Sequence, residues 1–292
     1  MNRFRKENKS VIFISHDLDE IMEVCDTLTV LRDGKIIRTF EKAEFEAGAI
    51  RASMIGRELQ GDYYRSDFQA SSQPEVALDV RNLVYEDRLK GISFQVHKGE
   101  IVGIGGLAHC GMHSLGKVCF GALKPEEGSV TVEDGTIIDS PAIAMKKRVG
   151  YVSKDRDVES LCLNASIEDN ISIAGMSEFA INNFLILKNR EKKYVNHQIE
   201  ELSIKCAGRD QSVSQLSGGN KQKVVFGKWI GCGSEILILD CPTRGVDIGV
   251  KQAMYQLMVR LKNEGKSILM ISEELPELIG MSDRILIMKN GE

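Results

Sequence analysis

A glycine-rich turn follows an apolar run in the first half of the sequence. Within Lys98–Gly111 (KGEIVGIGGLAHCG), Gly106 and Gly111 have the spacing of the phosphate-binding loop GxxxxGK[ST]. In such a loop the glycines let backbone N–H groups surround the phosphates, a lysine neutralises the outer phosphates, and a Ser or Thr holds Mg²⁺. Here Met112 stands at the lysine position and His113 at the Ser/Thr position. Taken alone, the turn therefore indicates phosphate binding only weakly.

An ordered set of motifs in the second half of the chain is far more specific. These motifs are Leu216–Lys223 (LSGGNKQK), Ile236–Asp240 (ILILD) and Cys241–Asp247 (CPTRGVD). The set resembles the ATP-binding cassette (ABC) family, whose signature is LSGGQ, whose Walker B strand is four apolar residues and Asp, and whose next loop ends in Asp. Asn220 replaces the usual Gln of the signature. Together with the run from Pro242 to Asp247, this departure resembles the tandem-cassette subfamily that imports simple sugars.

The resemblance covers nearly all of the chain apart from a linker, and it implies the fold. We expect a P-loop NTPase-like α/β cassette with a mainly parallel sheet, an antiparallel β subdomain and a helical subdomain. The residues agree with this expectation, because Leu78–Val80 and Ile92–Val96 alternate as strands. Strand and helix patterns then alternate, which is typical of a parallel sheet with helices on its faces.

The resemblance also implies where the signature acts. In this family two cassettes meet head to tail, and each ATP lies between the Walker A loop of one cassette and the signature of the other. Ser217, Gly218, Gly219 and Asn220 would therefore face the nucleotide of the first cassette. Ser217 Oγ and the glycine N–H groups would meet the γ-phosphate at a helix N-terminus, where anions are favoured. The alternative is a plain glycine turn before an amphipathic helix.

A second nucleotide site is implied around the glycine turn. Gly106 and Gly111 would approach the phosphates, and Asp247 would close the loop after the Walker B strand. Tyr85 would stack on adenine, although packing in the core or on the surface is an equal alternative for it. Asp240 would be a Mg²⁺ ligand, or else a buried carboxylate kept for structural reasons.

This second site departs from the family's catalytic set at five positions: Met112, His113, Lys154, Cys241 and Glu273. The first two lack the cation and the metal ligand. Lys154 stands where the family has Gln or sometimes Glu. Cys241 replaces the Glu that polarises water, and a thiol is a poor base for that work. Glu273 replaces the switch histidine, so we predict a degenerate site that holds nucleotide without turnover, if it is occupied at all.

An internal repeat sets the domain organisation. Residues 9–20 (KSVIFISHDLDE) align with residues 266–277 (KSILMISEELPE), so far apart that each copy is a whole domain rather than a solenoid unit. Each copy predicts a buried strand, a loop, a short helix, a strand and a turn. We therefore expect a C-terminal fragment of a first cassette at 1–56, a linker at 57–76 and a degenerate second cassette at 77–292, with the chain ending short of its natural terminus.

His16 follows the first strand of the repeat, where the family keeps the switch histidine that senses the γ-phosphate. A lone His after a strand is otherwise surface or core filler. If the family role holds, His16 and the signature at Leu216–Gly219 complete one composite site, and the departures all belong to the other. We therefore predict an asymmetric pair in which only the first site hydrolyses ATP.

Composition excludes several classes of protein. Of the 292 residues, 42% are hydrophobic and 27% are charged, as in an ordinary globular protein. A net charge of −4 leaves no global positive field, so nucleic acid is not an expected partner. The apolar runs are far shorter than the roughly 20 residues of a membrane-spanning helix. The 7 cysteines are scattered and never form CxxC, which suits reduced thiols in a cytosol and implies no zinc site.

The resemblance thus implies the energising subunit of a sugar importer, using ATP and Mg²⁺ at the cytoplasmic face of the cell membrane. Its partners would be membrane permease subunits, a sugar-binding protein acting through them, and either the rest of the first cassette or a second copy. We expect little or no ATPase activity from this chain alone. A regulatory or scaffolding pseudo-ATPase is the alternative, and a DNA-repair or translation ABC protein is disfavoured by the acidic balance.

Overall fold

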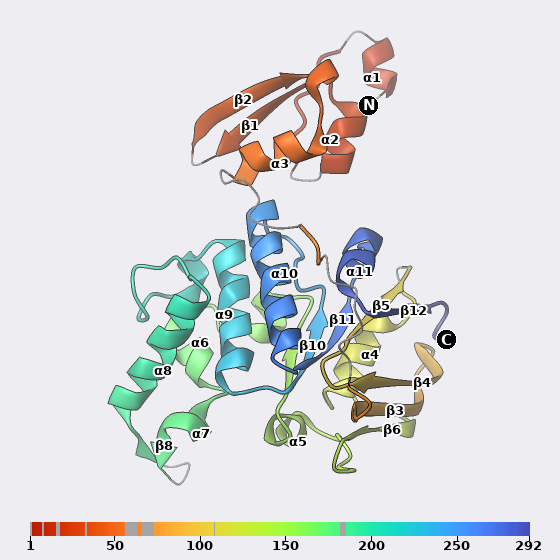
Figure 1. Cartoon of the computed structure of the whole chain (residues 1–292), viewed down its shortest axis with the longest axis vertical. Helices are drawn as coiled ribbons and strands as arrows, with labels where there is room; N and C mark the ends of the chain where they lie inside the picture. The colour runs from red at the N-terminus through yellow and green to blue at the C-terminus, as the bar shows by residue number, and fades with distance from the viewer. Residues whose placement is uncertain are drawn as a thin grey trace. The chain divides into compact units, whose positions relative to one another are not determined.

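A computed structural model describes residues 2–7, 9–15, 18–32, 34–55, 63–65, 73–107, 109–181 and 185–292. The chain divides into two compact units, the first comprising Met1–Tyr63 with Asp247–Ala253 and the second Tyr64–Val246 with Met254–Glu292 (Figure 1). The boundary after Tyr63 falls inside the predicted linker, of which residues 57–62 and 66–72 lie outside the described residues.

The first unit is built around a β-hairpin. Its elements are α1 (Asn2–Lys6), α2 (Leu18–Val24), β1 (Thr27–Arg32), β2 (Lys35–Glu41), a 3₁₀ turn (Lys42–Glu44) and α3 (Ala47–Ile55). Strands β1 and β2 pair antiparallel. Leu18, Val30, Phe40 and Ile50 are buried and pack together, so one face of the hairpin is covered by the two helices that flank it in sequence. The helix, strand and turn predicted after residue 17 are thus present.

The strand predicted at Val11–Ile14 is not present, and that prediction was wrong. Residues 9–15 form no strand, and Ile12 and Ile14 are each 92% exposed. The aligned run Ser267–Ile271 is a fully buried strand because it has a parallel neighbour on each side. In the described part of the first unit the hairpin is the only sheet, so Val11–Ile14 has no such neighbours. An apolar run becomes a central strand only where adjacent strands satisfy its backbone groups.

Two sheets form the framework of the second unit. The antiparallel sheet has the order β4-β3-β6, with β3 (Val76–Tyr85), β4 (Leu89–His97) and β6 (Glu127–Val132). The parallel sheet has the order β12-β5-β11-β10-β7, with β5 (Ile101–Gly106), β7 (Val149–Val152), β10 (Ile236–Asp240), β11 (Ser267–Ile271) and β12 (Arg284–Met288). Strands β7, β10 and β11 are buried at every position, as expected for continuous apolar runs in a parallel sheet covered on both faces.

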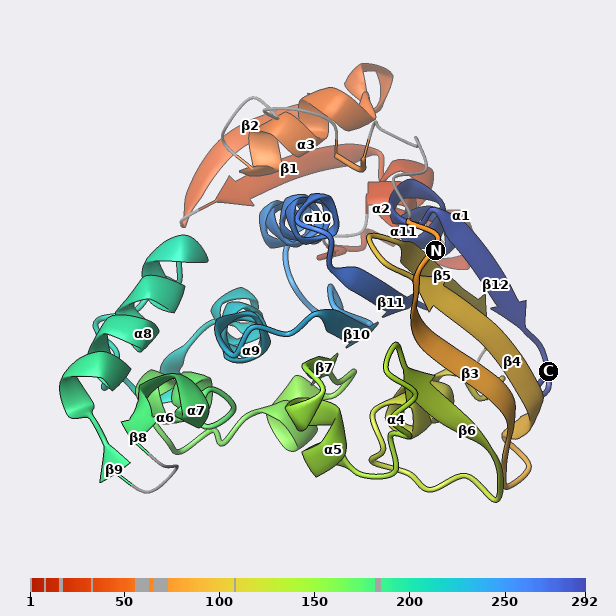
Figure 2. The same ribbon diagram turned by 60° about the horizontal axis from the view of Figure 1, so that its bottom comes forward.

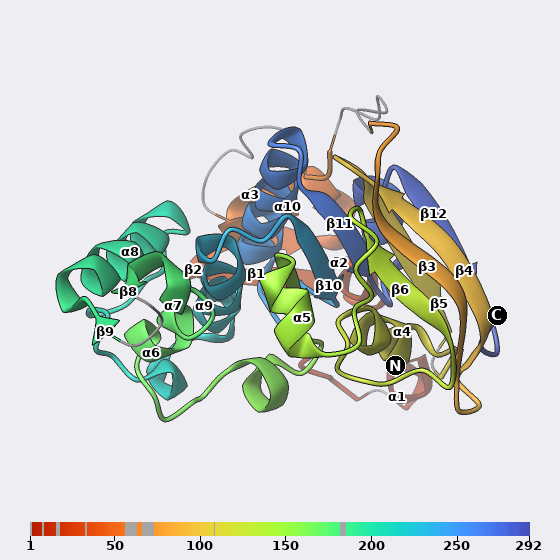
Figure 3. The same ribbon diagram turned by 90° about the horizontal axis from the view of Figure 1, so that it is seen from below.

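The helices of the second unit connect and cover these strands. They are α4 (Met112–Cys119), α5 (Pro141–Lys146), α6 (Ile167–Ser172), α7 (Met176–Phe179), α8 (Lys188–Glu201), α9 (Gly218–Gly231), α10 (Ile248–Asn263), of which residues 248–253 belong to the first unit, and α11 (Leu275–Met281). Helices α6, α7 and α8 gather at one end of this unit with the short strands β8 (Ala180–Ile181) and β9 (Leu185–Ile186), and the antiparallel sheet lies at the other end (Figures 2 and 3). None of the helices described is both long enough and apolar enough to cross a membrane.

A buried ion-pair group joins the start of β12 to the rest of the second unit. Asp283 accepts a hydrogen bond from the Ile101 backbone N–H at 2.8 Å. The same carboxylate pairs with Arg65 at 2.8 Å and with Lys262 at 2.9 Å, and all three side chains are at least 92% buried. Removing one member of such a group leaves the others charged and unpaired in the interior.

We therefore expect Asp283→Asn to destabilise the second unit by about 3–5 kcal/mol, measured by urea unfolding. Asp87 lies in the same unit and is exposed, so Asp87→Asn is the matched control. That control should change stability by less than about 0.5 kcal/mol, as is usual for surface positions. Equal effects of the two substitutions would contradict the structural role of Asp283.

Candidate functional site

The glycine turn connects the end of β5 to the start of α4. Gly111 has a φ of +101°, and a Cβ atom there would lie 2.0 Å from the carbonyl oxygen of Arg88. Only glycine fits this position, because the left-handed backbone and the close approach both exclude a side chain. Met112, which begins α4, is 1% exposed and is therefore part of the core. Its thioether offers no charge to a phosphate.

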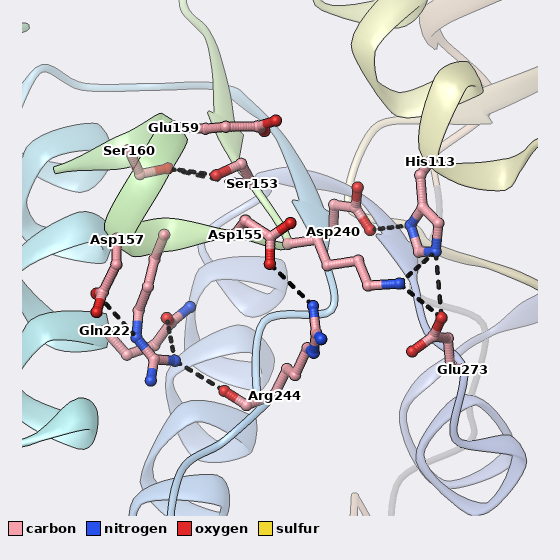
Figure 4. Close-up of polar contacts among 12 residues, drawn as sticks. His113, Ser153, Asp155, Asp157, Glu159, Ser160, Gln222, Asp240, Arg244 and Glu273 are labelled. Atoms are coloured by element: carbon pink, nitrogen blue, oxygen red, sulfur yellow. Dashed lines mark hydrogen bonds and ion pairs between the residues drawn. The ribbon is translucent and has the colours of Figure 1, made fainter.

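Four of the predicted site residues meet at one edge of the parallel sheet (Figure 4). Asp240 ends β10, Lys154 lies two residues beyond β7, and Glu273 lies two residues beyond β11. His113 is the second residue of α4. The carboxyl ends of parallel strands lie along the same edge, which is where open α/β sheets bind ligands.

These four side chains form a continuous chain of polar contacts. His113 Nδ1 lies 2.7 Å from Asp240 Oδ1, Lys154 Nζ lies 3.0 Å from His113 Nε2, and Lys154 Nζ lies 2.7 Å from Glu273 Oε1. His113 Nε2 also lies 3.4 Å from Glu273 Oε1, so this nitrogen faces both an ammonium and a carboxylate. A carboxylate oxygen only accepts, so Nδ1 of His113 donates to Asp240. We call His113, Lys154, Asp240 and Glu273 the polar cluster.

Protein donors satisfy both oxygens of Asp240. Its side chain is fully buried, and Tyr151 donates its hydroxyl to Oδ2 at 3.3 Å while His113 occupies Oδ1. Burial, together with the Asp240 carboxylate, raises the pKa of Tyr151 far above its usual range, so the phenol stays a donor. At the exposed side of the cluster, the hydrogen bond from Lys154 lowers the pKa of Glu273, which keeps this carboxylate ionised.

Cys241 adds no catalytic base to the cluster. The residue is 8% exposed, and burial, with further contributions from Asp240 and Glu273, raises the pKa of its thiol. A protonated thiol cannot take a proton from water. Cys241 therefore supplies no base at the position that follows the Walker B strand.

The donors of His113, Asp240 and Cys241 lie within 4.8 Å of one another, so we considered whether they suit a metal ion. Mg²⁺ takes oxygen ligands in near-octahedral geometry. This group offers one carboxylate, a nitrogen that already carries a proton for that carboxylate, and a thiol whose pKa is raised. A transition metal would have to displace both protons. The residues present do not fit Mg²⁺, and the predicted Mg²⁺ role of Asp240 gains no support from its surroundings.

The predicted adenine-stacking residue lies on a segment that packs against the glycine turn. Tyr85 ends β3, and the Arg88 carbonyl three residues later makes the close approach to Gly111. Arg88 Nη1 also donates to Ser114 Oγ in the first turn of α4 at 3.3 Å. The structure therefore brings the Tyr85 segment and the phosphate-loop segment together, as the stacking prediction requires.

The signature forms the N-terminus of α9. Ser217 is the N-cap residue and is exposed, and the amide nitrogen of Asn220 donates to Ser217 Oγ at 3.0 Å. Asn220 Oδ1 in turn accepts the Lys205 backbone N–H at 2.8 Å. Among the residues that the structure describes, no hydrogen bond or ion pair links Ser217–Asn220 to the polar cluster. The signature and the glycine turn of this cassette are thus separate, as the head-to-tail arrangement requires.

Arg156 is a site residue that the sequence analysis missed. It begins a π-helical turn, Arg156–Ser160, just after Lys154. Its guanidinium donates to the Arg244 carbonyl at 2.7 Å, to the Gly245 carbonyl at 3.3 Å and to Gln222 Oε1 of α9 at 3.3 Å. It thus ties the loop after β10 and the signature helix to the segment after β7. Two of its partners are backbone carbonyls, which leave no mark on the sequence, so no motif could have identified it.

Arg156→Met removes these hydrogen bonds, and we expect it to cost about 2 kcal/mol of stability by urea unfolding. Hydrogen exchange should also become faster in residues 241–246. Arg156→Lys should cost less, because an ammonium keeps the charge but not the planar fork. Arg81→Met, at a 73% exposed side chain, is the control. A Met variant with unchanged exchange in this loop would show that Arg156 does not hold it.

Comparisons with known proteins identify the family. The fold and the paired motifs define a nucleotide-binding cassette, and a profile of the ABC transporter family (ABC_tran) matches residues 89–244. The chain belongs to the ABC transporter family. Proteins of this family bind ATP, and the mixed α/β cassette fold predicted from the sequence is confirmed.

The chain is similar to ribose import ATP-binding proteins. It is 38% identical over 292 residues to "Ribose import ATP-binding protein RbsA" of Clostridium tetani (strain Massachusetts / E88), covering 100% of this chain and 57% of that protein. It is 38% identical over 288 residues to the protein of that name from Bacillus subtilis (strain 168), covering 98% of this chain and 58% of that protein. The chain therefore spans little more than half the length of these curated relatives.

Solved structures of single cassettes share the fold. The ADP conformation of MJ1267, an ATP-binding cassette of an ABC transporter, superposes with a TM-score of 0.61 at 23% identity, covering 74% of this chain and 88% of that one. The dimeric post-hydrolysis state of the cassette MJ0796 bound to ADP and Pi gives a TM-score of 0.62 at 19% identity, covering 73% of this chain and 95% of that one.

Proposed function

We propose that this chain is part of the ATP-binding subunit of a sugar importer, and that it contains the end of one cassette, a linker and a second, degenerate cassette. The observation that carries this proposal is the 38% identity to a ribose import ATP-binding protein, which extends over all 292 residues. The importer would place the subunit at the cytoplasmic face of the membrane, with permease subunits as direct partners and a sugar-binding protein acting through them.

The two well-preserved features of the chain would serve one composite site. Ser217 Oγ and the N–H groups of Gly218 and Gly219 would bind the terminal phosphate of ATP held by the first cassette, with Asn220 orienting the Ser217 hydroxyl. His16, which would be the switch histidine of that site, lies outside the described residues. Its assignment therefore rests on the repeat alone.

The geometry around the signature supports its role in coupling. Arg156 links α9 to the loop after β10 and to the segment after β7, so movement of the signature would be transmitted to both. Binding of ATP between two cassettes would favour their closure, and release of the products would reopen them. The 292 residues contain no GxxxxGK[ST] loop, so we expect little or no ATPase activity from them alone.

A second candidate, a regulatory or scaffolding pseudo-ATPase, is favoured by one observation. The four side chains of the polar cluster, at the predicted nucleotide site of the second cassette, are bonded to one another. In that case turnover would be irrelevant to function. Stimulation of ATP hydrolysis by a permease in a two-cassette protein would support the importer, and its absence would support the pseudo-ATPase.

The division of labour between the two sites predicts unequal effects of mutation. In a two-cassette protein with a complete first cassette, Ser217→Ala and His16→Ala should each lower kcat at least about tenfold, because each removes a contact to the reacting phosphate. Glu273→Ala should change kcat less than about twofold. Steady-state phosphate release measures all three, and equal losses from His16→Ala and Glu273→Ala would contradict the asymmetric arrangement.

A further inference from the structure

The residues of the polar cluster do not fit the ligand that the fold is built to bind. We propose that His113, Lys154 and Glu273 determine the specificity of the second site by excluding Mg²⁺ and the terminal phosphate of ATP, whose positions they occupy themselves. This inference rests on the assignment of the glycine turn and β10 to a nucleotide site. The loss of catalytic groups would explain only why the site does not hydrolyse ATP. The present inference assigns a role to the residues that replace those groups, namely to prevent binding.

The metal position is closed by a hydrogen bond. In P-loop NTPases, Mg²⁺ is held by the Ser or Thr of the phosphate-binding loop and by the Walker B Asp. His113 and Asp240 stand at these two positions here. Here His113 Nδ1 and Asp240 Oδ1 are 2.7 Å apart, and Tyr151 occupies the other oxygen. A Mg²⁺ ion needs oxygen ligands at about 2.0–2.1 Å. It could reach Asp240 only by breaking the hydrogen bond and displacing the imidazole.

The position of the terminal phosphate is closed by charge. The cation of the cluster, Lys154, is paired with Glu273 at 2.7 Å, and Met112 supplies no second cation. Two carboxylates, those of Asp240 and Glu273, lie in this cluster, and Lys154 is its only lysine or arginine. The γ-phosphate would add further negative charge beside them. If Lys154 turned to the phosphate instead, Glu273 would lose its ammonium partner and keep only the 3.4 Å contact with His113 Nε2. Its carboxylate would then lie close to the phosphate, and like charges repel.

The cluster also takes over a connecting role. In a working P-loop site, the metal and the phosphates join the glycine turn to the ends of neighbouring strands. Here the polar cluster itself joins α4 to the ends of β7, β10 and β11 (Figure 4). The second cassette therefore keeps this edge assembled without a nucleotide, and the first cassette's ATP is left as the ligand that drives closure.

Calorimetric titration of the 292-residue chain with ATP, with Mg²⁺ or with EDTA, tests the proposal. The wild-type chain should show no saturable binding up to about 1 mM ATP. E273Q keeps the shape of the side chain but removes its charge and frees Lys154, so it should bind ATP at least about tenfold more tightly, with or without Mg²⁺. The variant M112K/H113S/K154Q/E273H restores the cation and the metal ligand. It should bind ATP at least about tenfold more tightly only when Mg²⁺ is present.

A matched control uses an ion pair of the same kind away from the site. Lys98 Nζ and Glu133 Oε1 are also 2.7 Å apart, so K98Q/E133Q should leave ATP binding at the wild-type level. Circular dichroism shows whether each variant is folded. If the fourfold variant does not fold, the ATP affinity of E273Q alone tests the proposal. Wild-type binding with a Kd below about 0.1 mM would overturn the proposal.

Failure of both variants to bind more tightly than wild type would also overturn the proposal, because the cluster would then not be what prevents binding. Neither result decides whether the protein is an importer. That proposal fails on a different measurement, the absence of permease-stimulated ATP hydrolysis in a two-cassette protein.

Discussion

The hydrogen bond between His113 and Asp240 is the interaction on which the rest of the second site depends. A carboxylate that is completely removed from water is costly unless donors satisfy it, and His113 and Tyr151 are those donors. The other ring nitrogen of His113, Nε2, lies 3.0 Å from Lys154 Nζ and 3.4 Å from Glu273 Oε1, and Lys154 donates to Glu273 at 2.7 Å. The four residues are thus one cooperative unit, in which each partner is oriented by the one before it.

The region around the polar cluster and the region around the signature would therefore have different functions. In the proposed arrangement the polar cluster would close the nucleotide site of the cassette, whereas Ser217 at the N-terminus of α9 is exposed and accepts a hydrogen bond from Asn220. Arg156 lies between these regions and binds the loop after β10 as well as α9. On this proposal the cassette would hold no working nucleotide site of its own and would still present its signature to another cassette.

The parts of the fold that depend on local pattern were predictable from the sequence. The buried strands β10 and β11, the glycine turn and the signature helix all lie where their motifs indicated. The strand at Val11–Ile14 was predicted wrongly, because a strand needs neighbours that no local pattern reveals. Motif alignment identified His113, Lys154 and Glu273 one at a time as departures. Their mutual bonding depends on side-chain orientation, which only the tertiary structure determines.

We propose that the second cassette contributes a signature but no site for Mg²⁺ and ATP. The number of nucleotides bound to a two-cassette protein tests this proposal most directly. Equilibrium dialysis with a non-hydrolysable ATP analogue and Mg²⁺ should reach a plateau near one nucleotide per molecule, because only the first Walker A loop would hold one. A plateau near two, with both sites of similar affinity, would contradict the account.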